Sequence, residues 1–221
     1  MRARLCHLVL TFLGACALLL GSSAHALTPD QAARIADGDS DSRIAALNEA
    51  VASVDPGLVP FIEAILAHEV MVADGRAFIV RDGTTVEAGS DAATSLPAGA
   101  EEVINNNRMR RALRSAMATI RLFSPERDAR ERAIAALKGE VDEDMLDLIK
   151  KAEAAETDTE LKVQIALLKA SVLISSSDRG KRLEAAKLLA DSDQPVTKSL
   201  LLERLADGAE GDPVVRAALL A

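Results

Sequence analysis

Apolar residues recur at helical spacing along most of the chain. One set occupies positions i, i+3, i+4, i+7 and i+8, which places five side chains on a single helical face: Leu58, Phe61, Ile62, Ile65 and Leu66. Met145, Leu148, Ile149 and Ala152 repeat this spacing, and Leu161, Ile165, Leu168 and Val172 form a longer stripe at i, i+4, i+7 and i+11. The pattern predicts amphipathic helices, each of which must bury its apolar face against a neighbour.

Capping signals indicate where these helices begin. Thr28-Pro29-Asp30-Gln31 and Thr157-Asp158-Thr159-Glu160 have the sequence of capping boxes, and three pairs place a cap before a proline: Asp55-Pro56, Ser124-Pro125 and Asp212-Pro213. Together with the apolar spacing, these signals predict helices over 29–37, 41–53, 57–70, 102–123, 125–138, 142–155, 158–175, 178–190 and 195–207, and one beginning at 212. The short links between them predict antiparallel helical hairpins.

A short pattern, Asp-x-x-x-Arg-x-x-Ala, occurs three times within the predicted helices. Its copies are Asp39, Arg43 and Ala46, then Asp128, Arg132 and Ala135, then Asp178, Arg182 and Ala185. The last two copies are 50 residues apart, slightly more than the period of about 40 to 47 residues in HEAT and armadillo repeats. The fold class predicted is therefore all-α, a HEAT/armadillo-like helical repeat solenoid.

Residues 69–99 interrupt the helical pattern. Apolar residues alternate with others on both sides of two turn signals, Asp74-Gly75 and Asp82-Gly83, and this arrangement predicts a small three-stranded β meander. The expected organisation is then a signal peptide, an N-terminal helical repeat, a β-hairpin or meander insertion with its loop, and a helical repeat region whose last helix is incomplete: 1–26, 27–70, 71–99 and 100–221.

The first 26 residues have the three parts of an export signal. Arg2 and Arg4 precede an apolar stretch over 8–20, and Ala24-His25-Ala26 is a cleavage site of the A-x-A type. We therefore expect a location on the periplasmic side of the inner membrane. Leu13-Gly14-Ala15-Cys16 offers an alternative, because it resembles a lipoprotein box that would leave Cys16 lipidated.

Composition limits the chemistry of the exported part. Both cysteines lie in the leader and His68 is the only histidine after it, so neither a zinc site nor a Cys-His nucleophile can be assembled. No apolar run after the leader approaches the roughly 18 residues that cross a bilayer. Nucleic acid is not expected as a partner, because the net charge is −8 and only 2% of residues are aromatic. We predict no catalytic residues, no metal and no cofactor.

Asp37, Asp39 and Asp41 alternate like the first ligands of a calcium loop. The rest of the loop pattern is missing, since Ser42 stands where the turn requires Gly and Asn48 where it requires Glu. This spacing favours a helix-capping acidic turn over a metal site.

Five arginines crowd one predicted helix: Arg108, Arg110, Arg111, Arg114 and Arg121. At 100° per residue, Arg110, Arg114 and Arg121 share one face and Arg111 flanks it. One interpretation is ion pairing with a neighbouring helix such as the one that carries Glu126 and Glu131. The other is docking, either to anionic lipid headgroups at a membrane surface or to another subunit. We expect this stripe and the meander around Phe78 to form the contact surface.

The run Asn106-Asn107-Arg108-Met109-Arg110-Arg111, followed by Leu113 and Leu122-Phe123-Ser124-Pro125, resembles the extracytoplasmic N-terminal region of urea ABC transporter permeases. These permeases are of the UrtB type, within the branched-chain amino acid permease family. The leader, the Asp37–Asp39 start, the β insertion and the Ala/Leu-rich helices follow the same order, so the resemblance extends over essentially the whole chain.

The resemblance implies a structural, protein-binding role in urea uptake, with a second permease and a periplasmic substrate-binding protein as partners. It also implies a membrane domain that would follow Ala221, so we expect the chain to be truncated before the pore. The alternative is a free-standing periplasmic HEAT-like scaffold or binding protein unrelated to transport. Membrane-spanning segments encoded downstream of codon 221 would favour the permease, and an enzyme that uses the repeats as a platform would require a pocket of carboxylates.

Overall fold

The computed structural model describes residues 27–90, 92–190, 192, 195–206 and 209–220. The expected signal peptide, its cleavage site and the alternative lipidation of Cys16 lie outside the described residues. Within them the chain is mostly helical and carries one small antiparallel sheet.

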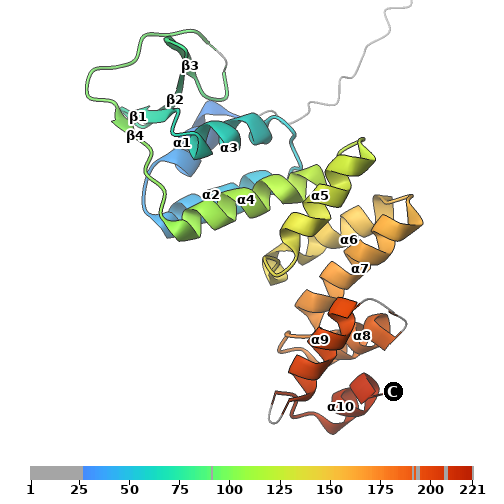
Figure 1. Cartoon of the computed structure of the whole chain (residues 1–221). Helices are drawn as coiled ribbons and strands as arrows, with labels where there is room; N and C mark the ends of the chain where they lie inside the picture. Colours follow the sequence, from blue (N-terminus) through green and yellow to red (C-terminus); the bar gives the residue numbers. More distant parts are fainter. Residues whose placement is uncertain (1–26, 91, 191, 193–194, 207–208, 221) are drawn as a thin grey trace, which may run out of the picture.

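The helices follow one another with short links, interrupted by the sheet after the third helix. In order they are α1 (Pro29–Ala36), α2 (Ser40–Val51), α3 (Leu58–Leu66), α4 (Asn107–Arg121), α5 (Arg127–Leu137), the short 3-10 turn Glu143–Met145, α6 (Leu146–Ala155), α7 (Thr159–Leu173), α8 (Arg179–Ala190), α9 (Pro195–Leu205) and α10 (Pro213–Leu220). Figure 1 shows the sheet beside α1–α3 at one end, with α4–α10 stacked away from it toward the C-terminus.

The sheet is larger than the predicted meander. Its strands are β1 (Val70–Ala73), β2 (Arg76–Arg81), β3 (Thr84–Glu87) and β4 (Glu101–Glu102), in the order β3-β2-β1-β4 with every pair antiparallel. Both predicted turns are present, because Asp74 and Gly75 have φ of 51° and 69°, and Asp82 and Gly83 have φ of 51° and 76°. Two successive positive φ angles suit the right-handed twist of a tight hairpin.

The predicted helix over 102–123 begins five residues late, which corrects the expectation. Val103 N–H donates to Val70 O at 3.0 Å, so the chain at this point still extends the sheet. The helix begins only after Asn106, whose Oδ1 accepts Met109 N–H at 2.8 Å. The predicted helix over 57–70 likewise ends at Leu66, since Val70 already belongs to β1.

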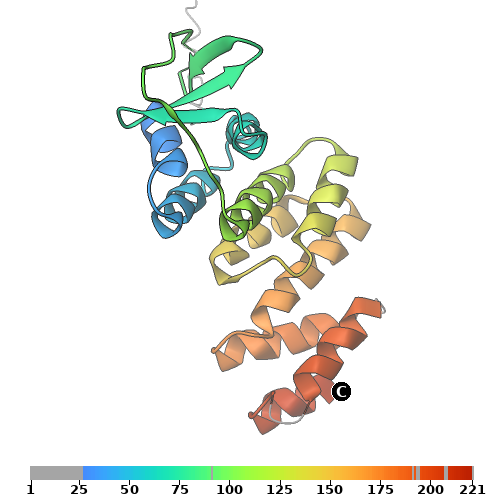
Figure 2. The ribbon, with the colours of Figure 1, turned by 60° about the vertical axis from the view of Figure 1, so that its left-hand side comes forward.

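Two hydrophobic cores follow one another along the molecule. The first joins α1–α4 to the inner face of the sheet, and the second runs from α4 to α10. Helix α4 belongs to both, since Met109 and Leu113 lie in the first core and Ala118 lies in the second. The row of helices in Figure 2 therefore turns away from the sheet at α4.

A three-helix arrangement recurs along the chain, as α2–α4 with the sheet inserted, α5–α7 and α8–α10. In the first helix of each set, buried residues lie three, four and seven positions after an arginine: Arg43 before Ala46, Leu47 and Ala50; Arg130 before Ala133, Ile134 and Leu137; Arg182 before Ala185, Ala186 and Leu189. In the third helix, buried residues lie three and seven positions after a capping residue: Asn106 before Met109 and Leu113; Asp158 before Leu161 and Ile165; Asp212 before Val215 and Leu219.

This recurrence corrects the middle copy of the pattern found in the sequence. Arg132 and Ala135 are exposed, and Arg130 with Ala133 occupies the place equivalent to Arg182 with Ala185. The true separation of these arginines is thus 52 residues instead of 50. The sequence comparison slipped by two positions because Asp and Ala are frequent in this chain and matched by chance.

Candidate interaction surfaces

An arginine clamp with a buried glutamate joins α5 to the turn before α7. Arg130 Nε donates to Glu156 Oε2 at 2.7 Å, and its other nitrogens donate to Glu156 Oε1 at 3.1 Å and to the carbonyls of Ser124 and Pro125 at 3.0 Å each. The Glu156 side chain is only 1% exposed and also accepts the N–H groups of Thr157 and Asp158. Every strong hydrogen-bonding group of the clamp therefore has a partner, which a buried ion pair requires.

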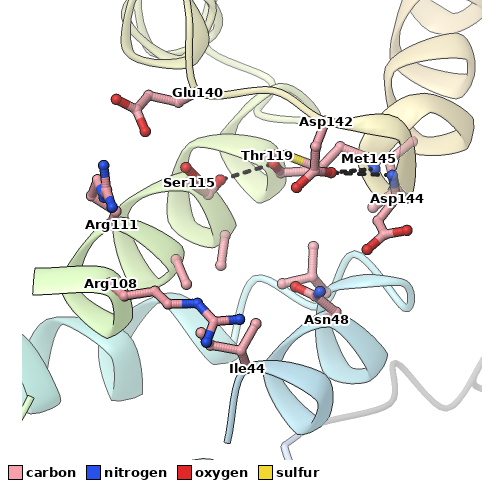
Figure 3. A pocket seen from close by; sticks show the side chains of 14 residues that line it. Ile44, Asn48, Arg108, Arg111, Ser115, Thr119, Glu140, Asp142, Asp144 and Met145 are labelled. Carbon is pink, nitrogen blue, oxygen red and sulfur yellow. Dashed lines mark hydrogen bonds between the residues drawn. The ribbon is translucent and has the colours of Figure 1, made fainter. Parts of the chain in front are cut away.

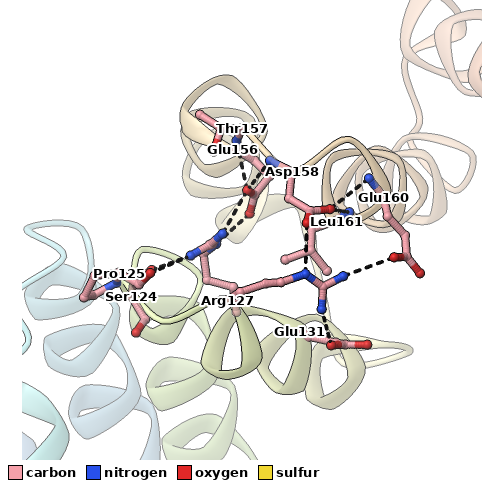
Figure 4. Close-up of polar contacts among 10 residues, drawn as sticks. Ser124, Pro125, Arg127, Glu131, Glu156, Thr157, Asp158, Glu160 and Leu161 are labelled. Carbon is pink, nitrogen blue, oxygen red and sulfur yellow. Dashed lines mark hydrogen bonds and ion pairs between the residues drawn. The ribbon is translucent and has the colours of Figure 1, made fainter.

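A second arginine extends this clamp outward (Figure 4). Arg127 contacts three carboxylates: Asp158 at 2.9 Å, Glu131 at 2.7 Å and Glu160 at 3.1 Å. Asp158 also caps α7 by accepting the N–H groups of Glu160 and Leu161. The predicted capping box at Thr157-Asp158-Thr159-Glu160 is therefore wrong by one residue, because the cap is Asp158 and not Thr157.

An equivalent clamp occurs in the next three-helix unit, α8–α10. Arg182 Nε donates to Glu210 Oε2 at 2.9 Å, and its Nη1 donates to the carbonyls of Ser176 at 3.0 Å and Ser177 at 2.9 Å. Arg179 pairs with the capping Asp212 at 2.8 Å, as Arg127 does with Asp158. Sequence reasoning missed both clamps, although a Glu-x-Asp signature precedes each third helix, at Glu156-Thr157-Asp158 and Glu210-Gly211-Asp212.

Both clamp glutamates are held in the ionised form. Hydrogen bonds from Arg130 lower the pKa of Glu156 below its ordinary value of 4.5, against the opposing effect of burial. For Glu210, burial is the largest influence and acts to raise the pKa. The Asp212 N–H, Arg182 and Arg204 together outweigh burial, and the pKa of Glu210 is lowered. Each clamp therefore carries a full ion pair at neutral pH.

The first unit forms its clamp without a carboxylate. Arg43, only 5% exposed, donates to Ile35 O at 2.9 Å, to Ile104 O at 3.0 Å and to Asn105 Oδ1 at 2.7 Å. These contacts join the end of α1 to the chain just before α4. In the same way, each of the other clamps joins the chain before the first helix of its unit to the chain before the third. Burial lowers the pKa of Arg43, and three neutral oxygens accept its hydrogen bonds.

Two of the five α4 arginines pair with neighbouring helices, as one interpretation of the stripe expected, but these helices are α2 and α3. Arg108 contacts Asp41 of α2, and Arg121 contacts Glu63 of α3 at 2.7 Å. The expected pairing with the helix of Glu126 and Glu131 is wrong, since Glu131 is bound by Arg127 on its own helix. Among the residues that the structure describes, no carboxylate oxygen lies within 4.0 Å of the remaining three guanidinium groups, which belong to Arg110, Arg111 and Arg114.

A cleft of about 310 Å³ with mixed polar and apolar lining lies on one side of α4, between α2 and the turn that leads from α5 into α6. Figure 3 shows Arg108 and Arg111 on one wall and Asp142 and Asp144 across from them. Asp142 Oδ1 already accepts the N–H groups of Asp144 and Met145 at 3.1 and 3.3 Å. The acidic wall of this cleft is thus partly occupied in capping the turn.

An apolar groove of about 430 Å³ lies on the other side of α4, where α3, α4 and α5 meet. Three guanidinium groups line it, from Arg114, Arg121 and Arg132. The apolar lining consists of Leu66, Met117, Ala118, Ala129, Ala133 and Ala136. The structure therefore places Arg108 and Arg111 at the first cleft and Arg114 and Arg121 at this groove, while Arg110 lines neither of them. Within the described residues, Arg114 and Arg132 stand in this groove beside an apolar floor without a carboxylate oxygen within 4.0 Å.

Phe78 is not available as a contact residue, which corrects the expectation. Its side chain is fully buried, at 0% exposure. The guanidinium carbon of Arg76 lies 5.1 Å from the centre of the ring, and Arg76 also pairs with Glu87 at 2.6 Å. Alternation correctly predicted a strand at Phe78, but alternation does not say whether both faces of a sheet are covered.

The acidic turn before α2 caps that helix, as predicted. Asp39 Oδ1 accepts the N–H groups of Asp41 and Ser42 at 2.9 and 3.0 Å, and these bonds lower the pKa of Asp39.

His68 Nδ1 lies 2.7 Å from Glu102 Oε1 on the surface. Within the described residues, no group of three His, Cys, Asp or Glu side chains could hold a metal ion, and no helix is long and apolar enough to span a bilayer.

Comparison of the chain with protein-family models, with curated proteins and with solved structures finds no match. The surfaces described above must therefore be interpreted from their own chemistry. The strongest chemical signal among them is the groove at α3–α5, where positive charge is not balanced by neighbouring carboxylates.

Proposed function

We propose that the chain is a non-catalytic, exported scaffold of the HEAT/armadillo-like class, and that it docks to another protein through the groove between α3, α4 and α5. Solenoids of stacked helices present extended surfaces for protein partners. The recurring clamps of Arg130 and Arg182 support this class, because they fix successive three-helix units in the same way. The single observation that carries the docking role is the excess of unpaired guanidinium groups on α4 and α5.

In its specific form, the proposal places this scaffold in the extracytoplasmic part of a urea-type ABC transporter permease, on the periplasmic side of the inner membrane. The resemblance of the segment 106–125 to such permeases supports it. The partners would be the second permease and the periplasmic substrate-binding protein. The role is structural, namely holding these proteins together during urea uptake.

The test is affinity purification of the tagged, exported chain from crosslinked envelopes of the source cells, followed by mass spectrometry. We expect transporter subunits to co-purify and to be lost when Arg114→Glu, Arg121→Glu and Arg132→Glu are combined, with the helical circular-dichroism signal unchanged. Retention of unrelated envelope proteins in the same arginine-dependent way would assign the chain to the free-standing scaffolds instead. Proteins retained equally by the triple variant would contradict the docking role itself.

A further inference from the structure

The chain contains a second helix junction that is built like the first. Helices α7 and α8 repeat α4 and α5 with a constant offset of 52 residues, so that buried Ala116, Ala118 and Ile120 correspond to buried Leu168, Ala170 and Val172. The groove of α3–α5 thus has a direct counterpart at α6–α8.

At the second junction the charges are balanced within the chain. Lys169 occupies the position equivalent to Met117, is only 12% exposed, and pairs with Glu153 at 2.6 Å and with Glu184 at 4.0 Å. Ala166 stands where the first junction has Arg114, and Glu184 stands where it has Arg132. Because two carboxylates already balance the charge of Lys169, this junction does not attract an acidic partner.

At the first junction the same positions produce an open, positively charged groove. Arg114 and Arg132 have no carboxylate oxygen within 4.0 Å among the described residues, and Glu63 balances only Arg121. The whole sequence is acidic, with 34 carboxylate against 26 basic side chains. An acidic partner is therefore attracted to this groove and repelled by the net negative charge of the molecule as a whole, which favours binding here.

The shape of the groove selects a helix as the complementary structure. Ala129, Ala133 and Ala136 lie on one face of α5, and their small side chains leave room for larger apolar side chains from a partner. A helix with Leu or Ile at i, i+3, i+4 and i+7 can fill such a groove, while acidic residues beside that stripe reach the guanidinium groups. A flat lipid surface could contact the arginines but could not fill the concave apolar floor.

We propose that the groove between α3, α4 and α5 binds an acidic amphipathic helix of a partner protein. This inference rests on the proposed docking function and names the chemical class of its ligand. Arg114 and Arg132 bind the acidic edge of that helix, and the alanine floor of α5 receives its apolar edge.

The test is a fluorescence-anisotropy titration of the whole exported chain with a labelled peptide designed as an amphipathic helix of Leu and Glu. Two control peptides replace every Glu by Lys, or every Leu by Ser. We expect saturable binding of the Leu/Glu peptide alone, weakened by about tenfold or more in Arg114→Glu and in Arg132→Glu. The matched control is Arg111→Glu, which makes the same charge change on an unpaired arginine of α4 but faces the other cleft, and should change affinity by less than about twofold.

A transplant supplies a second, independent measurement. Combining Ala166→Arg, Lys169→Met and Glu184→Arg gives the second junction the residues equivalent to Arg114, Met117 and Arg132 of the first, and we expect the stoichiometry to rise from one peptide per chain to two. Equal weakening by Arg111→Glu, or binding of the Lys peptide, would overturn the proposal, because attraction would then not depend on this groove.

Two further outcomes also overturn it. If vesicles of phosphatidylcholine and phosphatidylglycerol bind the chain through Arg114 and Arg132 and displace the peptide, the groove is a lipid site. If no peptide binds while envelope proteins are still retained in an arginine-dependent way, the acidic-helix ligand is wrong but the docking function stands.

Discussion

The first and second units of the molecule solve the same structural problem with different chemistry. In each, an arginine joins the chain before the first helix to the chain before the third. Arg130 does so with the carboxylate of Glu156, whereas Arg43 does so with two carbonyls and the amide of Asn105. The comparison teaches that the geometry of the clamp is what recurs, and that the charge of its acceptor can change.

The largest effect is expected when the charged clamp loses its arginine. Arg130→Met leaves the carboxylate of Glu156 buried without a counter-ion, and we expect a loss of about 3 kcal/mol in the free energy of unfolding. Urea denaturation followed by circular dichroism measures it. The control is Arg132→Met on the same helix, which is exposed and should change stability by less than about 0.5 kcal/mol. Equal effects of the two substitutions would contradict the clamp.

Removing the neutral clamp should lower the free energy of unfolding by a smaller amount. Arg43→Met leaves the acceptors of Ile35, Ile104 and Asn105 buried without their donor, but leaves no buried charge. We expect a loss of about 2 kcal/mol, measured in the same way. A loss that exceeds the one in Arg130→Met would show that the acceptor's charge does not decide the strength of the clamp.

Lowering the pH should weaken the two clamps that contain a glutamate and leave the neutral clamp of Arg43 unchanged. The pKa values of Glu156 and Glu210 are lowered in the folded chain, so their contribution to stability is present above 4.5, their ordinary value, and is lost as the pH falls through the lowered folded values. We expect the unfolding free energy to decline with a shallower slope below pH 4.5 when Glu156→Gln and Glu210→Gln are combined. An unchanged slope would mean that Glu156 and Glu210 have the same pKa in the folded and the unfolded chain, which would contradict the prediction.

The position of the helices could be predicted largely from the sequence, because caps and apolar spacing are local signals. The capping box at Thr28 is present, with Gln31 N–H donating to Thr28 Oγ1 at 3.2 Å, and Asp212 caps α10 as expected. The proline signals were less reliable, since α5 begins at Arg127 and α3 at Leu58, each two residues after its proline. Turns that precede a helix can contain proline without starting it.

The features that sequence reasoning missed depend on contacts between distant residues. Strand β4 consists of Glu101 and Glu102, which show no apolar alternation, and is formed only because β1 offers a free edge. The clamp partners Arg130 and Glu156 are 26 residues apart, and nothing in the local sequence joins them. The arginine stripe was recognised, but its division between two clefts follows from how α2, α3 and α5 pack around α4.

The smallest stability effect is expected from converting one clamp into the other. Asn105→Asp gives Arg43 a carboxylate partner, but it also removes the weak donation of Asn105 Nδ2 to Ile65 O and Val103 O, both at 3.4 Å. We expect a change of less than about 1 kcal/mol at neutral pH, together with a steeper loss of stability in acid. A large destabilisation at neutral pH would show that the site of Arg43 tolerates only a neutral acceptor.

Hydrogen–deuterium exchange of the whole chain, with and without the acidic Leu/Glu helix peptide, tests the central claim most directly. The account predicts slower exchange on peptide binding in residues 107–137 of α4 and α5, and unchanged exchange in residues 159–190 of α7 and α8. Protection spread evenly over both helix pairs, or confined to α7 and α8, would contradict the claim that one open groove among these repeated helices receives the partner.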